Sequence, residues 1–585
     1  MRSFFKYVFA CLLALCLFAF AGFVFFSIII ASLATQTSSM VFEGKAPLSK
    51  KVIDSEAILY LPLRGNIPDD TTQEEANFLR DDNNEVVALP TLLSSLQDAC
   101  SNDKIKAISV HFKQTNADLA TLGEIRDALL KCKSQGKSLY GYAYNLQEKE
   151  HYVTSALDTL MMYPEGFVEF DGFSITSPFF ADLLNGIDAK VYVFRAGNFK
   201  AAVEPLIRNN YSEANKIQLN TFLNDIYDNF LNAIAKKNNT PIDQLRKLAE
   251  QLNINSSRSA QTHGLVDIIG TYEDYETMLR RKLNLKSKAE LPLIRYNELP
   301  QETKNHSHNQ IALLTIEGEI NNESAQTLAK NLVKVRNENN VKAVVIRINS
   351  PGGGFIPSDM LWEKIQYVRE KKPVIASMGN MAASGGYYIA TACSTIFASP
   401  TTLTGSIGVF SLFFDISQSA KHMGISFDKV ATNPLADNTY DITQPMKTQS
   451  ITYRQQMTEN VYQTFVNKVA KSRNITPEYA HTIAQGRIWS GQNAKHKKLV
   501  DNLGGLQQAI QNAAKQANIK SYTIYIPQKN NIERLMTMLA QFVTTKQWIT
   551  QWLNNTQTPP LKQIHQTLKP YQDIQARLLY DIYMP

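Results

Sequence analysis

Ser384 is the residue of this chain best suited to act as a nucleophile. It lies in the stretch GNMAASGGYY, residues 379–388, where small residues precede it and two glycines follow. A second stretch, SPGGG at residues 350–354, offers backbone N–H groups that can approach a ligand closely. A serine hydroxyl attacks a carbonyl when a base takes its proton, and such N–H groups can hold the resulting oxyanion. Together the two stretches indicate acyl transfer, although each alone would also fit an ordinary turn.

The surrounding sequence predicts the elements that bring these stretches together. Short apolar runs such as AVVIRIN and PVIASM alternate with amphipathic runs such as DMLWEKIQYVREK. This alternation predicts successive βαβ units, an α/β fold and a parallel sheet. SPGGG follows one predicted strand and Ser384 follows the next, so both should lie at the same edge of the sheet. Ser384 would then open a helix whose free N–H groups, including that of Gly385, point to the same place.

An internal repeat divides most of the chain into two copies of this α/β unit. Residues 105–115 resemble residues 341–351, and residues 151–164 resemble residues 387–400, both at an offset of 236 positions. Unrelated segments would rarely share one offset. We therefore predict four regions, which are an N-terminal segment (1–45), a first repeat (46–305), a second repeat (306–525) and a C-terminal extension (526–585). The extension contains no motif that we can place, and we expect a helical assembly or membrane-surface element there.

The base that would activate Ser384 is not an obvious histidine. Among nine histidines, His422 is the one that soon follows Ser384, and its position at a predicted helix end indicates a surface residue. The repeat offers Lys200 instead, in the apolar stretch GNFKAAV of the first repeat, which has neither the serine nor the glycine turn. Burial would bring the pKa of this lysine toward neutrality, whereas Glu204 would oppose that shift if it pointed inward. A solvated surface lysine is the alternative interpretation.

The N-terminus predicts a membrane anchor. Residues 7–34 contain no charged side chain, and this apolar run exceeds the length of about 20 residues that spans a bilayer. A cleaved secretory signal is the competing interpretation, but its apolar region would be shorter. Arg2 and Lys6 precede the run, which places the N-terminus in the cytoplasm and the rest of the chain on the far side. Lys45, Lys50 and Lys51 count against that orientation.

Composition narrows the possible partners and cofactors. The net charge of +7 arises from 60 basic and 53 acidic residues without a dense basic block, so we expect no nucleic-acid partner. Outside the apolar N-terminal run the cysteines are Cys100, Cys132 and Cys393. Their odd number and the absence of a CxxC pair predict buried free thiols rather than disulfides or a zinc site. We expect no cofactor.

Four separated motifs resemble the signal peptide peptidase A family, also called protease IV, in its long duplicated form. They are GNFKAAVEP, INSPGGG, GNMAASGGYYIA and TLTGSIGVF, within a resemblance that runs from about residue 50 to about residue 520. The resemblance implies tandem Clp protease/crotonase-like βαβ spiral domains. It also implies a dyad of Ser384 and Lys200, with Ser406 holding the lysine amine. The oxyanion donors would be backbone groups around Gly352, Gly353 and Gly385.

The resemblance further implies a location and a substrate class. Such a protein is bound to the bacterial inner membrane, faces the periplasm, and assembles as a homotetramer. Its substrates are cleaved signal peptides and other extended apolar peptides. Two rival interpretations are a crotonase-type acyl-CoA enzyme, which would normally be soluble and use carboxylates, and a non-catalytic membrane scaffold.

Overall fold

The computed structural model describes residues 53, 55–74, 86–285, 290–299, 307–527 and 575–577. The membrane anchor predicted for residues 7–34 lies outside these residues. Within the described ranges, no helix combines the length and the apolar character that crossing a membrane requires.

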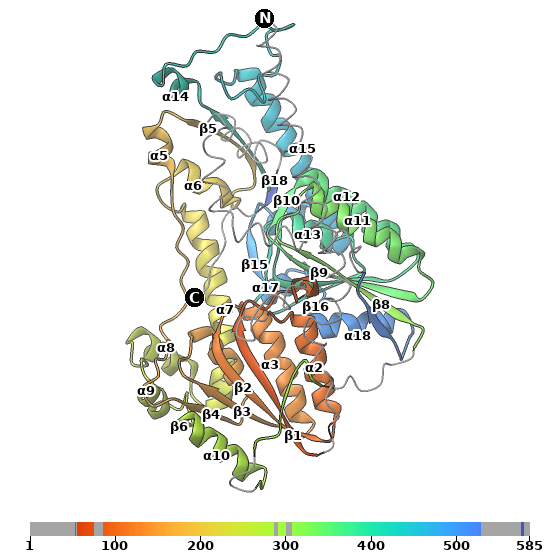
Figure 1. Ribbon diagram of the computed structural model, residues 1–585. Helices are drawn as coiled ribbons and strands as arrows, with labels where there is room; N and C mark the ends of the chain where they lie inside the picture. Colours follow the sequence, from red (N-terminus) through yellow and green to blue (C-terminus); the bar gives the residue numbers. More distant parts are fainter. Residues whose placement is uncertain are drawn as a thin grey trace, which may run out of the picture.

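The first repeat is built on a six-stranded parallel sheet with the strand order β6-β4-β3-β2-β1-β7. Its strands are β1 (Ala57–Gly65), β2 (Ile105–Thr115), β3 (Ser138–Ala143), β4 (Thr159–Met162), β6 (Ile268–Ile269) and β7 (Leu293–Arg295). Helices α2 (Leu89–Ser101) and α3 (Leu119–Ser134) connect the first three strands. Figure 1 shows these two helices side by side against the sheet.

The second repeat has the same strand order. Its sheet runs β16-β12-β11-β9-β8-β17, with β13 and β15 added beside β11. The strands are β8 (Gln310–Glu317), β9 (Val341–Ser350), β11 (Val374–Ala383), β12 (Thr395–Ala398), β13 (Leu403–Gly405), β15 (Ile488–Ser490), β16 (Asn502–Leu503) and β17 (Thr523–Tyr525). Helices α11 (Asn322–Asn337), α12 (Phe355–Arg369) and α13 (Gly385–Ala390) follow β8, the short strand β10 (Gly352–Gly354) and β11, respectively.

Each repeat also contributes one long helix. These helices are α7 (Glu213–Asn238) and α15 (Thr448–Arg473), both of 26 residues and both ending at an asparagine in the left-handed conformation. Shorter helices include α4 (His151–Thr154), α5 (Ala181–Gly186), α6 (Glu204–Ile207), α8 (Ile242–Glu250), α9 (Ser257–Thr262), α10 (Tyr272–Lys282), α14 (Ser417–His422), α16 (Pro477–Ile483) and α17 (Gly491–His496). The predicted α/β fold and its tandem duplication are confirmed.

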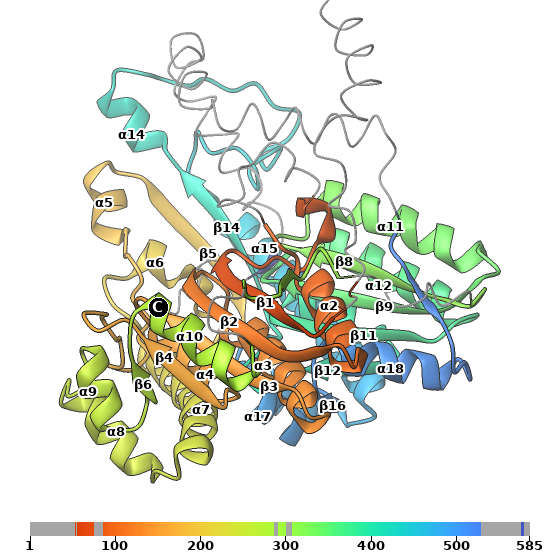
Figure 2. The ribbon, with the colours of Figure 1, turned by 60° about the horizontal axis from the view of Figure 1, so that its bottom comes forward.

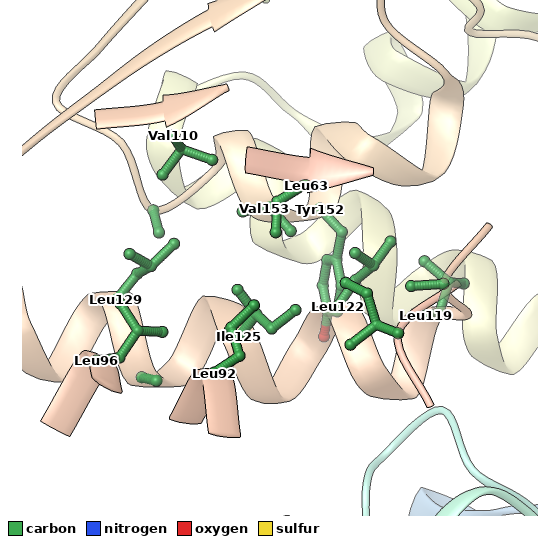
Figure 3. Close-up of a cluster of buried hydrophobic side chains, with 14 of the residues drawn as sticks. Leu63, Leu92, Leu96, Val110, Leu119, Leu122, Ile125, Leu129, Tyr152 and Val153 are labelled. Carbon is green, nitrogen blue, oxygen red and sulfur yellow. The ribbon is translucent and has the colours of Figure 1, made fainter. Parts of the chain in front are cut away.

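Hydrophobic packing joins the two repeats into one body. On α3, Leu122, Ile125 and Leu129 recur at helical spacing on one face, and Figure 3 shows them gathered with side chains of α2 and of the sheet. The same buried cluster continues into α18 (Leu506–Gln516) and the β-sheet of the second repeat. The chain therefore folds around an apolar core that both repeats share.

A buried ion triad crosses the same interface. Arg347 of β9 is fully buried, and its guanidinium lies 2.7 Å from Asp69 Oδ1 and 2.7 Å from Glu124 Oε1, both from the first repeat. Removing one partner of a buried pair leaves an uncompensated charge, which typically costs about 3–5 kcal/mol. The triad therefore favours one relative placement of the two repeats.

A small third sheet, with the order β10-β18-β14-β5, also combines the repeats. Strand β5 (Lys190–Ala196) of the first repeat pairs antiparallel along its whole length with β14 (Val409–Asp415) of the second. Figure 2 shows these two strands alongside each other above the main sheets. The other strands are β10 (Gly352–Gly354) and β18 (Gln575–Arg577). The helical element expected in the C-terminal extension is wrong for residues 575–577, which form a strand.

The prediction of free thiols is wrong for two of the three cysteines. Cys100 at the end of α2 and Cys132 at the end of α3 form a disulfide, whereas Cys393 is free and buried. The two helices pack side by side, which places the two Cα atoms 4.7 Å apart. The sequence separation of 32 residues matches no pairing motif, because the contact depends on how the helices pack.

Candidate active site

Ser384 lies in a sharp turn between β11 and α13. Its backbone has φ 54° and ψ −114°, a conformation that costs a residue with a side chain about 1–3 kcal/mol. Two hydrogen bonds hold the turn, from Ser384 N–H to the Gly405 carbonyl at 2.8 Å and from Tyr388 N–H to the Ser384 carbonyl at 2.8 Å. Strained backbone of this kind is concentrated at functional sites. The turn places the hydroxyl at the first turn of α13 in a fully buried position.

The glycine turn lies directly beside Ser384. Strands β9 and β11 are parallel neighbours, so the prediction that both motifs share one sheet edge is confirmed. A Cβ atom added to Gly385 would lie 3.2 Å from Gly352 Cα, and one added to Gly386 would lie 2.8 Å from the Ser350 carbonyl oxygen. Only glycines allow this close approach of α13 to the turn.

The hydrogen bonds of the turn distinguish its amides. Gly352 N–H donates to Ser350 Oγ at 3.1 Å, and Gly354 N–H donates to the Ile320 carbonyl at 3.0 Å. Gly385 is the first residue of α13, where backbone N–H groups have no partner inside the helix. Gly353 and Gly385 are therefore better candidates than Gly352 for donors to an anion.

Lys200 reaches this site from the first repeat. It follows β5, which is held against β14, and the neighbouring Phe199 N–H donates to the Gln485 carbonyl at 2.8 Å. A Cβ atom on Gly486 would lie 2.6 Å from Lys200 Cα, so the segment after α16 touches the lysine backbone closely. The Lys200 Nζ atom lies 2.7 Å from Ser384 Oγ. The structure thus brings together two residues that are 184 positions apart.

Burial makes the lysine amine a suitable proton acceptor. The side chain of Lys200 is fully buried, and desolvation lowers its pKa from 10.5 to about 7. Glu204 is also buried, but its carboxylate accepts hydrogen bonds from Ser212 N–H and Asn215 Nδ2 rather than from Lys200. The opposing effect considered for Glu204 therefore does not arise from a direct contact. About half of such an amine is neutral at pH 7.

Ser406 completes the group of side chains around the amine. It follows β13 with φ 49°, and its N–H donates to the Arg487 carbonyl at 2.7 Å. The Lys200 amine lies 3.0 Å from Ser406 Oγ and 3.2 Å from the Ser406 carbonyl oxygen. These two contacts direct the amine toward Ser384.

Other residues considered from the sequence lie elsewhere. The side chain of His422 is 68% exposed and its Nδ1 lies 2.7 Å from Asp188 Oδ2, which confirms the prediction of a surface residue. Glu148, which aligns with Ser384 in the first repeat, is buried and accepts hydrogen bonds from the amides of Asp171 and Gly172. Sequence reasoning missed the contact of Gly486 with Lys200, because it joins segments of different repeats that no local pattern connects.

Comparisons with known proteins identify the family of this chain. The model of peptidase family S49 matches residues 131–286 and 366–520, and the Clp protease model matches residues 303–404. Protease 4 of Haemophilus influenzae is 30% identical, over 83% of this chain and 84% of its own length. Protease 4 of Salmonella typhi is 31% identical over 74% of this chain and 72% of its own length. The chloroplastic serine protease SPPA of Arabidopsis thaliana is 29% identical over 79% of this chain and 69% of its own length.

These matches show that the protein is a serine protease with tandem Clp protease-like domains. More specifically, the chain belongs to peptidase family S49. The resemblance to signal peptide peptidase A and protease IV that the motifs indicate is thereby confirmed.

Proposed function

We propose that this protein is a membrane-anchored endopeptidase whose Ser/Lys dyad is divided between the two repeats. The observation that carries the proposal is the 2.7 Å separation between Ser384 Oγ and the amine of a fully buried lysine. The first repeat supplies the base and the second supplies the nucleophile. This division gives a reason for the chain to retain both copies of the domain.

The proposed mechanism uses both residues twice. Neutral Lys200 takes the proton of Ser384 as the hydroxyl oxygen attacks a peptide carbonyl. The N–H groups of Gly353 and Gly385 stabilise the oxyanion, and Ser406 keeps the amine aimed at Ser384. Lys200 then protonates the leaving amine. In the second half of the cycle a water molecule gives its proton to Lys200 and its oxygen bonds to the ester carbonyl carbon. The bond to the Ser384 oxygen then breaks, and Lys200 returns the proton to that oxygen as the acyl group leaves as a carboxylic acid.

The proposed substrates are cleaved signal peptides and other extended apolar peptides. This part of the proposal rests on the four family motifs and on residues 7–34, whose apolar run would place the site beside membrane-derived peptides. We place the protein in the bacterial inner membrane, facing the periplasm, as a homotetramer. The Cys100–Cys132 disulfide supports an oxidising compartment.

A serine-reactive fluorophosphonate tests the proposal on the detergent-solubilised full chain. Peptide mapping should find the label on Ser384, and Lys200→Met should lower the labelling rate by about 10²-fold or more, the range expected for a lost general base. Ser134→Ala, at an exposed position of α3, is the matched control and should label like the wild type. In a crotonase-type enzyme or a non-catalytic scaffold Ser384 would stay unlabelled, and this outcome would contradict the proposal.

A further inference from the structure

Gln218 of α7 connects the segment that carries the proposed base to the second repeat. Its Nε2 atom donates a hydrogen bond to the Phe199 carbonyl at 3.1 Å, and its Oε1 atom accepts one from Ile488 N–H at 3.2 Å. Phe199 directly precedes Lys200, whereas Ile488 begins β15 of the second repeat. One side-chain amide therefore bridges two backbone segments of different repeats.

The residues just before β15 hold other parts of the same site. Phe199 N–H donates to the Gln485 carbonyl at 2.8 Å, so both backbone polar groups of Phe199 are bonded, the N–H to Gln485 and the carbonyl to Gln218. Ser406 N–H donates to the Arg487 carbonyl at 2.7 Å, and Arg487 is the residue before β15. Gln218 therefore ties the backbone next to the base to the segment that holds Ser406.

A buried polar network fixes the orientation of the Gln218 amide. Asn215 Nδ2 donates to the Glu204 carboxylate at 3.0 Å, which leaves Asn215 Oδ1 to accept a hydrogen bond from Gln218 Nε2 at 2.9 Å. The Gln218 oxygen then faces the Ile488 N–H, which can only donate. The three side chains are at most 2% exposed. Every bond agrees with this one orientation, and a fully satisfied buried network specifies a single arrangement.

We propose that Gln218 is a positioning residue of the divided dyad, which sets the Lys200 amine at bonding distance from Ser384. This inference rests on the proposed function of Ser384 and Lys200. Gln218 acts through the Phe199 backbone, since it bonds to the carbonyl that precedes Lys200. The amine lies 2.7 Å from Ser384 Oγ, and a misplacement of about 1 Å in an active site can cost about 10²-fold in rate.

Gln218→Met in the detergent-solubilised full chain tests the inference. Methionine is of similar size but makes none of the three hydrogen bonds. We expect kcat for an extended fluorogenic peptide to fall about 10- to 100-fold, and fluorophosphonate labelling of Ser384 to slow by the same factor. KM should stay within about twofold of the wild type, because the lost interaction serves the reaction and not substrate binding. Gln218→Asn keeps the amide but is too short to span both backbone segments, so its kcat should lie between those of Gln218→Met and the wild type.

Asp225 provides the matched control on the same helix. It lies seven residues after Gln218, on the same face of α7, and its Oδ2 atom accepts hydrogen bonds from Ser490 Oγ at 2.9 Å and from Asn493 Nδ2. These bonds also join the two repeats, but they end on side chains that follow β15 or close it. Asp225→Leu should lower the midpoint of denaturant unfolding and leave kcat within about twofold of the wild type.

The outcomes separate this inference from the proposed function. If folded Gln218→Met hydrolyses the peptide at the wild-type rate while Lys200→Met is inactive, the inference is refuted and the proposed function stands. An equal loss of kcat in Asp225→Leu would show that activity needs any bond between the repeats, which also overturns the inference. Loss of folded protein in both Gln218 variants would assign this residue a structural role instead. If Lys200→Met keeps the wild-type rate, the proposed function fails together with the inference.

Discussion

Lowering the pH from 8 to 6 should slow peptide hydrolysis about tenfold, because it protonates the amine that must accept the Ser384 proton. The pKa of Lys200 is lowered to about 7 by burial. About nine tenths of the amine is then neutral at pH 8 and about one tenth at pH 6. The neutral form is the active base, so activity rises with pH through the pKa and levels off above it. A lysine with an ordinary pKa would instead give a hundredfold rise over the same interval and no plateau.

The assay is kcat/KM for an extended fluorogenic peptide between pH 5.5 and 9.5. Glu148 is the matched control, since burial also raises its pKa to about 7 and it aligns with Ser384 in the repeat without a nucleophile. Glu148→Gln should leave the midpoint of the profile near 7. A rate that keeps rising tenfold per pH unit from pH 8 to 9.5 would refute the lowered pKa of Lys200. If the midpoint of the profile moves in Glu148→Gln, the pH dependence comes from Glu148 and its assignment to Lys200 is wrong.

Three further substitutions have defined outcomes. Ser406→Ala removes a hydroxyl 3.0 Å from the Lys200 amine and should lower kcat about 10- to 100-fold with little change in KM. Gly486→Ala places a Cβ atom 2.6 Å from Lys200 Cα and should lower activity similarly, whereas Gly186→Ala, with open space around it, should not. Replacing Cys100 and Cys132 together by alanine should lower the free energy of unfolding by about 4 kcal/mol for a loop of 32 residues. Denaturant titration measures this loss, and an unchanged midpoint would show that the disulfide contributes nothing to stability.

The repeat was the feature of the sequence that carried most information about the fold. Because residues 105–115 and 341–351 share an offset with a second pair of segments, one βαβ unit predicts the sheet order of the other. The proximity of Ser384 to the glycine turn also follows from sequence, since parallel strands end at one sheet edge. The position of Lys200 required the comparison of the repeats and the family motifs, because no local pattern distinguishes it from a surface lysine.

Features that depend on packing between distant segments could not be predicted from sequence. The Cys100–Cys132 bond depends on how α2 lies against α3. The antiparallel pairing of β5 with β14 joins residues of different repeats, and neither strand shows which partner it takes. Strand β18 has three residues in a segment without periodicity, and its pairing is set by the glycine turn it meets. The disulfide depends on packing within the first repeat, whereas the β5–β14 pairing depends on packing between the two repeats.

The most direct test of the divided dyad is hydrolysis of an extended, signal-peptide-like substrate by the detergent-solubilised protein. Wild type is compared with Ser384→Ala and Lys200→Met, with circular dichroism and gel filtration to verify that all three fold and assemble alike. Both variants should lose activity by about 10³-fold or more, in line with the loss of a nucleophile or its base. If folded Lys200→Met remains active near the wild-type rate, the base lies elsewhere and the functional reason given for two repeats is wrong.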